Sequence, residues 1–357
     1  MTSCNLFVNI PFVNGGSQFA ENVYEHTAPA VKRAYFEALL AEADGFASES
    51  LDVRSLTLGG GSVSTVPEEE LGRLLRGLKQ CFGLGADIPL YATFDPGLLT
   101  IGQANRLRET GIARPTFRYL AADSAQADPL GLPAGEVEMS KMDVLLEQAG
   151  MTDIGIEVAL GYREQTPRSL ETTLRKALRS TVQRYRLVLP RPEARAAREE
   201  LLALYEVARR WLADREFVEE RPLHFSRNGS TDPYVLDFYG TNSGEAVGTL
   251  SLGVSSVSCL DGMIWTNTGD IDAYLASRGA PDVTTESVVA LDETQQRLRC
   301  QLAALWRGEA APMTAALADV LSESGFFLPT SDGCVLANWG RLNHREAFAT
   351  FAAAQAS

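Results

Sequence analysis

A glutamate and a histidine near the ends of predicted strands are the candidate acid–base groups of this 357-residue chain. Glu157 stands between Ile156 and Val158 in an apolar run that predicts a buried strand. A buried carboxyl group has a raised pKa and can act as a general acid or base, or it can be the structural partner of a basic side chain. His224 lies near another predicted strand end, and a lone histidine is more often structural than catalytic. Glu157 and His224 are therefore the predicted catalytic residues, each with a structural alternative.

Polar residues at other strand ends are candidates for holding a ligand. Arg118 ends an apolar strand, where its guanidinium can clamp a carboxylate through two parallel hydrogen bonds or can simply face solvent. The run Gly59–Gly61 lets a ligand approach the backbone closely, or it only shapes a tight turn between a strand and a helix. The predicted ligand-binding residues are Asn9, Asn14, Gly59, Gly60, Gly61, Ser62, Thr93 and Arg118.

Composition disfavours several classes of protein. A net charge of -14 is unlike that of nucleic-acid binders, which normally carry a basic face. No apolar run approaches the ~20 residues that span a bilayer, and no signal-peptide pattern opens the chain, so we expect a cytoplasmic protein without a membrane partner. The five cysteines are scattered and the three histidines lie far apart, so we expect no metal site.

The elements that position these residues alternate between strand and helix from Leu6 to about Val188. Such alternation predicts parallel strands connected by helices, with ligands bound at the carboxyl ends of the strands. The predicted strands are Leu6–Ile10, Val53–Leu58, Leu90–Phe94, Pro115–Tyr119, Asp153–Leu160 and Arg184–Leu189. The predicted helices are Ala28–Phe46, Pro67–Cys81, Gly102–Thr110, Ser140–Gln148, Ser169–Leu178 and Glu193–Asp214.

The pattern changes after Asp270. Helices are predicted from Ile271 and over Thr294–Trp306 and Met313–Ser324. The segment Thr330–Gly333 then reads as the turn of a β-hairpin. Two domains are therefore predicted, an α/β barrel with an extension over residues 1–270 and a small winged-helix-like domain over residues 271–357.

A series of short motifs, spread over most of the chain, resembles the oxygen-independent coproporphyrinogen III oxidase and haem-chaperone family of the radical S-adenosylmethionine (SAM) superfamily. The matching segments are Ile10–Phe12 for IPF, Gly59–Ser64 for GGGTPS, Asp95–Thr100 for NPGTLT, Leu160–Thr166 for FGLPGQT and Leu252–Gly262 for LGAGAHSYLDG. The resemblance implies a partial (β/α)6 TIM-like barrel of the radical SAM type, followed by a small C-terminal domain. It also implies SAM and an iron–sulfur cluster as the family's cofactors.

The chain differs from that family at the positions that bind the family's cofactors. Val13, Ser17 and Ala20 occupy the three positions of the cluster cysteines. Residues that the resemblance assigns to SAM binding are also replaced, among them the family's glutamate by Thr93 and its glutamine by Leu120. Reductive cleavage of SAM needs an iron cluster held by three thiolates, and no other three cysteines here have a suitable spacing. We therefore expect no iron–sulfur cluster and no 5'-deoxyadenosyl radical.

Three functions are compatible with this pattern. The first is a repurposed barrel that binds a small metabolite, SAM or a SAM-derived species, for non-radical group transfer, cyclisation or isomerisation. The second is a haem or porphyrin carrier, which the few histidines and the absence of a Cys-Pro pair disfavour. The third is a non-catalytic partner of an active radical SAM enzyme. The sequence is compatible with a protein partner or with a homo-oligomer.

Overall fold

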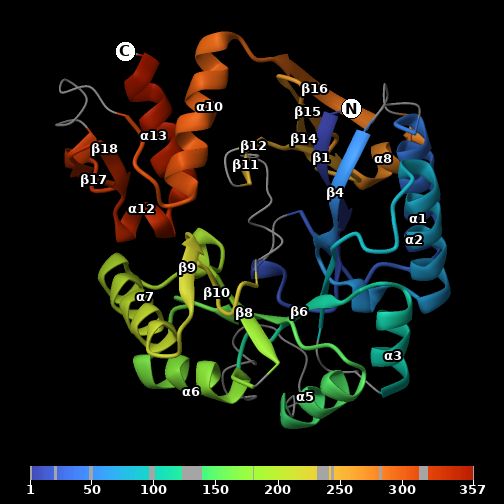
Figure 1. Cartoon of the computed structure of the whole chain (residues 1–357), viewed down its shortest axis with the longest axis horizontal. Coiled ribbons are helices and arrows are strands. Elements are labelled where there is room, and N and C mark those ends of the chain that lie inside the picture. Colours follow the sequence, from blue (N-terminus) through green and yellow to red (C-terminus); the bar gives the residue numbers. More distant parts are fainter. Residues whose placement is uncertain are drawn as a thin grey trace.

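A twelve-stranded open sheet organises the chain. The structure, a computed structural model, describes residues 2–19, 22–47, 51–95, 101–122, 139–179, 181–230, 241–242, 245–280, 284–312 and 321–356. Within these residues the strands follow the order β16-β15-β14-β13-β1-β4-β5-β6-β7-β8-β10-β9, so β16 and β9 form two free edges and the described sheet does not close. Figure 1 shows the sheet curving through the molecule.

Seven neighbouring strands of this sheet run parallel. They are β13 (Gly248–Leu252), β1 (Thr2–Ile10), β4 (Leu51–Gly60), β5 (Leu90–Phe94), β6 (Arg114–Arg118), β7 (Ile154–Ala159) and β8 (Val182–Val188). The antiparallel strands β10 (His224–Ser226) and β9 (Val218–Arg221) extend one side. The other side is extended by β14 (Val257–Leu260), β15 (Met263–Asn267) and β16 (Thr285–Ala290).

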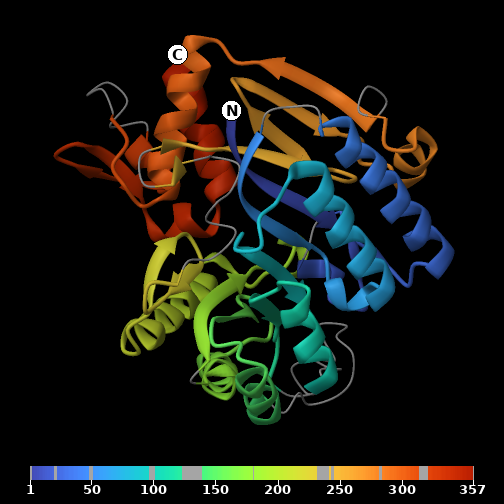
Figure 2. The ribbon, with the colours of Figure 1, turned by 45° about the vertical axis from the view of Figure 1, so that its right-hand side comes forward.

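Helices cover one face of the parallel strands, which we call the outer face (Figures 1 and 2). They are α1 (Pro29–Gly45), α2 (Glu68–Phe82), α3 (Ile101–Glu109), α5 (Met139–Gln148), α6 (Pro167–Ala177) and α7 (Arg198–Ala213). Short elements connect them: β2 (Phe12–Val13), η1 (Ser17–Phe19), β3 (Tyr24–Glu25), η2 (Val63–Thr65), η5 (Pro192–Ala194), β11 (Thr241–Asn242) and β12 (Glu245–Ala246). The predicted α/β architecture, a partial TIM-like barrel, is confirmed.

One predicted helix starts later than expected. The sequence predicts a helix from Glu193, but α7 begins at Arg198. Pro192–Ala194 form the short 3-10 helix η5, and the chain becomes extended at Arg195, which forms a bridge with Tyr162 and donates from its Nε to the carbonyl of Pro190. Tertiary contacts therefore override the helical periodicity of this segment.

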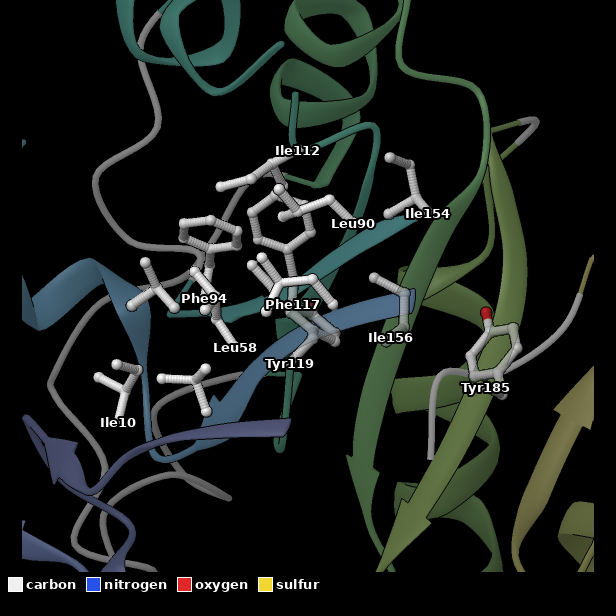
Figure 3. Packing of buried hydrophobic residues seen from close by; sticks show 14 of the residues in the cluster. Ile10, Leu58, Leu90, Phe94, Ile112, Phe117, Tyr119, Ile154, Ile156 and Tyr185 are labelled. Atoms are coloured by element: carbon white, nitrogen blue, oxygen red, sulfur yellow. The ribbon is translucent and has the colours of Figure 1, made fainter. Parts of the chain in front are cut away.

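Alternation along the strands separates two environments. Apolar side chains such as Ile10, Leu58, Phe94, Phe117 and Ile156 point to the outer face and pack under the helices (Figure 3). The residues between them point to the opposite, inner face, because successive strand side chains alternate. Many of these are buried and polar: Asn5, Asn9, Ser55, Thr57, Thr93, Thr116, Arg118, Glu157, Arg184, His224, Ser226, Thr249 and Ser251.

The C-terminal part builds a second hydrophobic core. It contains α10 (Glu293–Trp306), the hairpin β17 (Phe327–Thr330) and β18 (Gly333–Leu336), α12 (Asn338–Leu342) and α13 (His344–Ala356). The predicted hairpin is confirmed, whereas most of the helix predicted over Met313–Ser324 lies outside the described residues. This part contacts α7 and β9, with Arg341 3.2 Å from Glu219.

The predicted domain boundary at residue 270 stays a prediction. Two elements that follow it, α8 (Ile271–Ser277) and β16, pack with the main sheet. Tyr274 of α8 donates a hydrogen bond of 2.6 Å to the buried carboxylate of Glu42 on α1. Hydrophobic residues of the second core begin only at Leu298.

Candidate functional site

Four charged side chains of alternating sign cross the inner face near the carboxyl ends of neighbouring strands. Arg118 of β6 lies opposite Glu157 of β7, and Glu157 lies opposite Arg186 of β8. Arg118 Nη1 is 3.3 Å from Oδ1 of Asp95, and Arg118 Nε is 3.7 Å from Oε2 of Glu157. Arg186 Nη1 is 3.3 Å from Glu157 Oε1. We call Asp95, Arg118, Glu157 and Arg186 the charged row.

The two middle residues of the charged row are buried, and the two end residues are partly exposed to solvent. The side chains of Arg118 and Glu157 are 5% and 4% exposed, whereas those of Arg186 and Asp95 are 21% and 24% exposed. Glu157 is thus the shared counter-ion of two arginines, which is the structural role that the sequence left open for it. A ligand at this row meets the carboxyl group of Asp95 and the guanidinium of Arg186 first.

Asp95 is the carboxyl group of this row with spare hydrogen-bonding capacity. Its amide donates to the hydroxyls of Ser62 and Ser64 at 3.0 and 2.9 Å, which fixes the backbone after β5. Oδ1 faces Arg118, while Oδ2 is buried and makes no hydrogen bond with any described residue. Burial raises the pKa of Asp95, and the nearby Arg118 guanidinium and a hydrogen bond with the Ser62 side chain only partly oppose this.

A second cluster of charged side chains, around Asp153, connects β6, β7 and β8 near their amino ends. Arg184 is fully buried and donates through Nε to Asp153 Oδ1 at 3.0 Å and through Nη2 to the Asp153 carbonyl at 2.9 Å. Arg114 Nε lies 3.3 Å from Asp153 Oδ2, and the Ser230 hydroxyl donates to Asp153 Oδ1 at 2.6 Å. Gly155 lets β7 pack closely against β6, because a Cβ there would lie 2.5 Å from the Thr116 hydroxyl. Asp153 therefore neutralises two arginines at once.

The loop that carries Asn14 folds back onto the charged row. Arg118 Nη2 donates to the carbonyl of Gly16 at 3.3 Å. Phe19 packs with hydrophobic residues at the carboxyl ends of β6, β7 and β8: Leu120, Ala159, Tyr162 and Val188. Asn14 itself is exposed, and Val13 before it is buried. The segment at the family's cluster position is therefore held against the strands by this chain's own contacts.

The glycine run at the end of β4 packs against the neighbouring strand. Gly61 donates from its amide to the carbonyl of Ile10, and an added Cβ would lie 2.4 Å from the Phe12 carbonyl oxygen. Gly60 has φ +91°, and a Cβ there would lie 1.8 Å from the Asn9 side-chain oxygen. Asn9 in turn donates to the Val254 carbonyl at 2.7 Å. Close packing of the chain on itself therefore requires these glycines, whether or not a ligand is bound.

Replacing Gly61 with alanine should lower the free energy of unfolding by about 2–3 kcal/mol without any ligand, because the new methyl group meets backbone atoms that cannot move aside. Urea denaturation measures this. Gly72→Ala is the control: the site lies in α2 near only the flexible end of Arg76, and alanine there should add about 0.5–1 kcal/mol. Unchanged stability of the Gly61 variant would show that the glycine serves only a ligand.

His224 lies on the inner face beyond the charged row. It is opposite Arg186 in the pairing of β10 with β8, its Nδ1 is 2.8 Å from the Pro222 carbonyl, and it is 8% exposed. Its ring lies 6.0 Å from that of Trp306, which packs 4.8 Å from His344. His224 thus joins the barrel to the C-terminal part.

Acidification should destabilise the chain through His344. Burial, followed by Arg345 and His224, lowers the pKa of His344 to about 4 from 6.5. Between these two pKa values the unfolded chain binds the proton and the folded chain does not. The contribution of neutral His344 to the free energy of unfolding is therefore complete above pH 6.5 and is lost as the pH falls toward 4. Urea denaturation at about pH 7 and about pH 5 should show the decrease. His344→Phe should reduce it, whereas the exposed-site control His26→Asn should leave it unchanged.

The structure brings together part of the predicted set. Ser62, Arg118 and Glu157 meet around Asp95, and Thr93 lies on the same inner face two residues earlier. The prediction missed Arg186, although its alternation with Tyr185 and Leu187 placed it on the polar side of a strand. In the sequence, Asp95 directly follows the predicted strand Leu90–Phe94. Only the structure shows that its carboxylate pairs with Arg118.

The residues present do not fit an iron–sulfur cluster. Val13 and Ser17 occupy two of its three positions, and the third lies outside the described residues. The five cysteines belong to different elements, and they form no disulfide among the residues that the structure describes. In the part of the chain that the structure describes, no three His, Cys, Asp or Glu side chains are grouped as metal ligands. No helix there is long and apolar enough to cross a membrane.

The order of parallel strands and outer helices defines a radical SAM-type α/β fold. The solved structure of coproporphyrinogen III oxidase (HemN) from Escherichia coli, described as a radical SAM enzyme, is similar with a TM-score of 0.79 and 18% identity, covering 98% of this chain and 90% of HemN. Streptococcus suis SuiB bound to S-adenosylmethionine is similar over 70% of this chain and 59% of its own, with a TM-score of 0.44 and 13% identity. No family model and no curated protein matches the sequence. The HemN likeness shows the fold, and the chemistry has to come from the residues present.

Proposed function

We propose that this chain is a cluster-free barrel that binds a small zwitterionic metabolite of the SAM type and acts on it without radicals. The observation that carries the proposal is the charged row, which offers a carboxyl group at one end and a guanidinium at the other. A ligand with a cationic group and a carboxylate complements both ends. SAM and S-adenosylhomocysteine are ligands of this kind.

Asp95 is the acid–base group in this proposal. Its pKa is raised by burial, and Oδ2 has no hydrogen-bond partner among the described residues, so a proton can be held or released at that oxygen. Arg118 orients the group through Oδ1. Glu157 keeps both arginines in place. Group transfer, cyclisation and isomerisation are the reactions that such proton transfer supports.

The chemistry of the donor set supports the proposed absence of a cluster. A cluster that binds SAM through iron needs thiolates, and Val13 and Ser17 supply none. Phe19 packs against Leu120 and Ala159, which ties the loop to strand ends by apolar contacts. The proposed site is therefore built from the barrel side chains and not from this loop.

Thermal unfolding with added ligands tests the proposal. SAM or S-adenosylhomocysteine should raise the melting temperature by several degrees, because a ligand that binds only the native state stabilises it. Iron and sulfide, measured in the same sample, should be far below one cluster per chain. A response to haem alone would favour a carrier, and no response to any of the three would favour the non-catalytic partner. Either result would overturn the proposal.

A further inference from the structure

One edge of the twelve-stranded sheet is not covered by any segment that the structure describes. β16 pairs antiparallel with β15 on one side and is the last strand of the described sheet on the other. Figures 1 and 2 show it along the margin of the molecule, where the chain continues from its end into α10. Val288 is 58% and Val289 47% exposed, and the strand is exposed from Glu286 to Ala290. Alternate residues of such an edge direct their N–H and C=O groups away from the sheet.

The edge strand β16 carries little charge compared with the chain as a whole. Ser287, Val288, Val289 and Ala290 carry no charge, although the chain as a whole has a net charge of -14. Proteins normally protect an exposed edge with charged residues or proline. The opposite edge strand has such protection: β9 contains Glu219, whose carboxylate pairs with Arg341 of α12 and with Arg209 of α7. β16 has neither a proline nor a basic residue.

We propose that β16 is the contact strand of a homodimer, in which two copies pair β16 with β16 antiparallel about a two-fold axis. Two copies of an acidic chain repel one another, so a self-contact needs a surface without charge. Residues 287–290 provide that surface, and their backbone provides the hydrogen bonds. A symmetric antiparallel pair uses the same strand of both copies, which closes the assembly at two chains.

The one charged residue of β16 does not oppose this pairing. With the axis between Ser287 and Val288, Glu286 of one copy lies opposite Val289 of the other. With the axis at Val288, Glu286 lies opposite Ala290 instead. In both registers the two glutamates are kept apart and meet uncharged residues, which avoids the cost of like charges placed directly opposite.

A contact through one six-residue strand is small. Stable dimers bury about 800 Å² on each partner, so this dimer should form with an affinity in the micromolar range and depend on concentration. Sedimentation velocity from about 1 µM to about 200 µM chain should show the change from monomer to dimer.

Val288→Lys is the informative variant, because it places two lysines near the two-fold axis. Val218→Lys is the matched control: Val218 is an exposed valine on the other edge strand, 66% exposed, and the charge change is the same. We expect the first variant to weaken dimerisation at least tenfold and the second to leave it unchanged. Both should melt close to the wild-type temperature, since both sites are exposed.

A wild-type chain that stays monomeric over the whole concentration range would overturn the proposal. Equal dimerisation of the two lysine variants would also overturn it, because the contact would then lie elsewhere. The test uses no ligand, so its outcome is independent of the proposed function.

Discussion

Replacing Asp153 with asparagine should lower the free energy of unfolding by about 3–5 kcal/mol, the usual cost of removing one partner from a buried ion pair. Arg184 is fully buried and donates to Asp153 through two nitrogens, while Arg114 approaches the other carboxylate oxygen at 3.3 Å. The variant leaves the buried guanidinium of Arg184 without a counter-ion, whereas Arg114, whose side chain is 39% exposed, stays partly hydrated. Urea denaturation followed by circular dichroism measures the change.

The control for this prediction is Asp52→Asn. Asp52 lies 2.6 Å from Arg54, but the two side chains are 36% and 56% exposed. A surface ion pair contributes less than about 1 kcal/mol, so this variant should unfold nearly as the wild type does. Similar losses of unfolding free energy in the two variants would contradict the role of Asp153 as the shared ion-pair partner that holds β6, β7 and β8 together.

Glu157→Gln should have the second large effect, and it should act on stability and on ligand binding together. The carboxylate is 4% exposed and stands between Arg118 and Arg186. Its neutralisation leaves two positive charges facing each other, which should lower the free energy of unfolding by about 3 kcal/mol. Because Arg118 also orients Asp95 and the Gly16 carbonyl, SAM-type ligands should bind at least tenfold more weakly.

Glu37→Gln provides the matched control for Glu157→Gln. Glu37 lies 3.7 Å from Arg73 at the surface, with a side chain that is 60% exposed. It should change neither stability nor binding measurably. If Glu157→Gln unfolds like the wild type, Glu157 is not the counter-ion of the two arginines.

Much of the architecture could be predicted because strand and helix periodicities are local. The alternation that buries Ile156 and Val158 under the helices also sends Glu157 to the inner face, and this is readable from six residues. Ranges for β5 and α2 were predicted to within a residue for the same reason.

The partners of these residues could not be predicted, because they depend on register between distant strands. In the sequence, Arg118 lies 39 residues before Glu157, and Glu157 lies 29 residues before Arg186. Only the pairing of β6, β7 and β8 places the three in one row. The same holds for β16, which follows an apparent domain boundary yet joins the first sheet through β15. The glycines at the end of β4 illustrate a further limit: the sequence left two roles open, and only the structure shows the close approach of the Phe12 carbonyl that makes Gly61 necessary for packing.

Calorimetric titration of SAM into protein with measured iron and sulfide contents tests the central claim most directly. The charged row should bind SAM in a sample that contains no stoichiometric cluster, and Glu157→Gln should weaken that binding while Glu37→Gln does not. A stoichiometric iron–sulfur cluster in the purified chain, or the absence of SAM binding to the intact charged row, would contradict the claim.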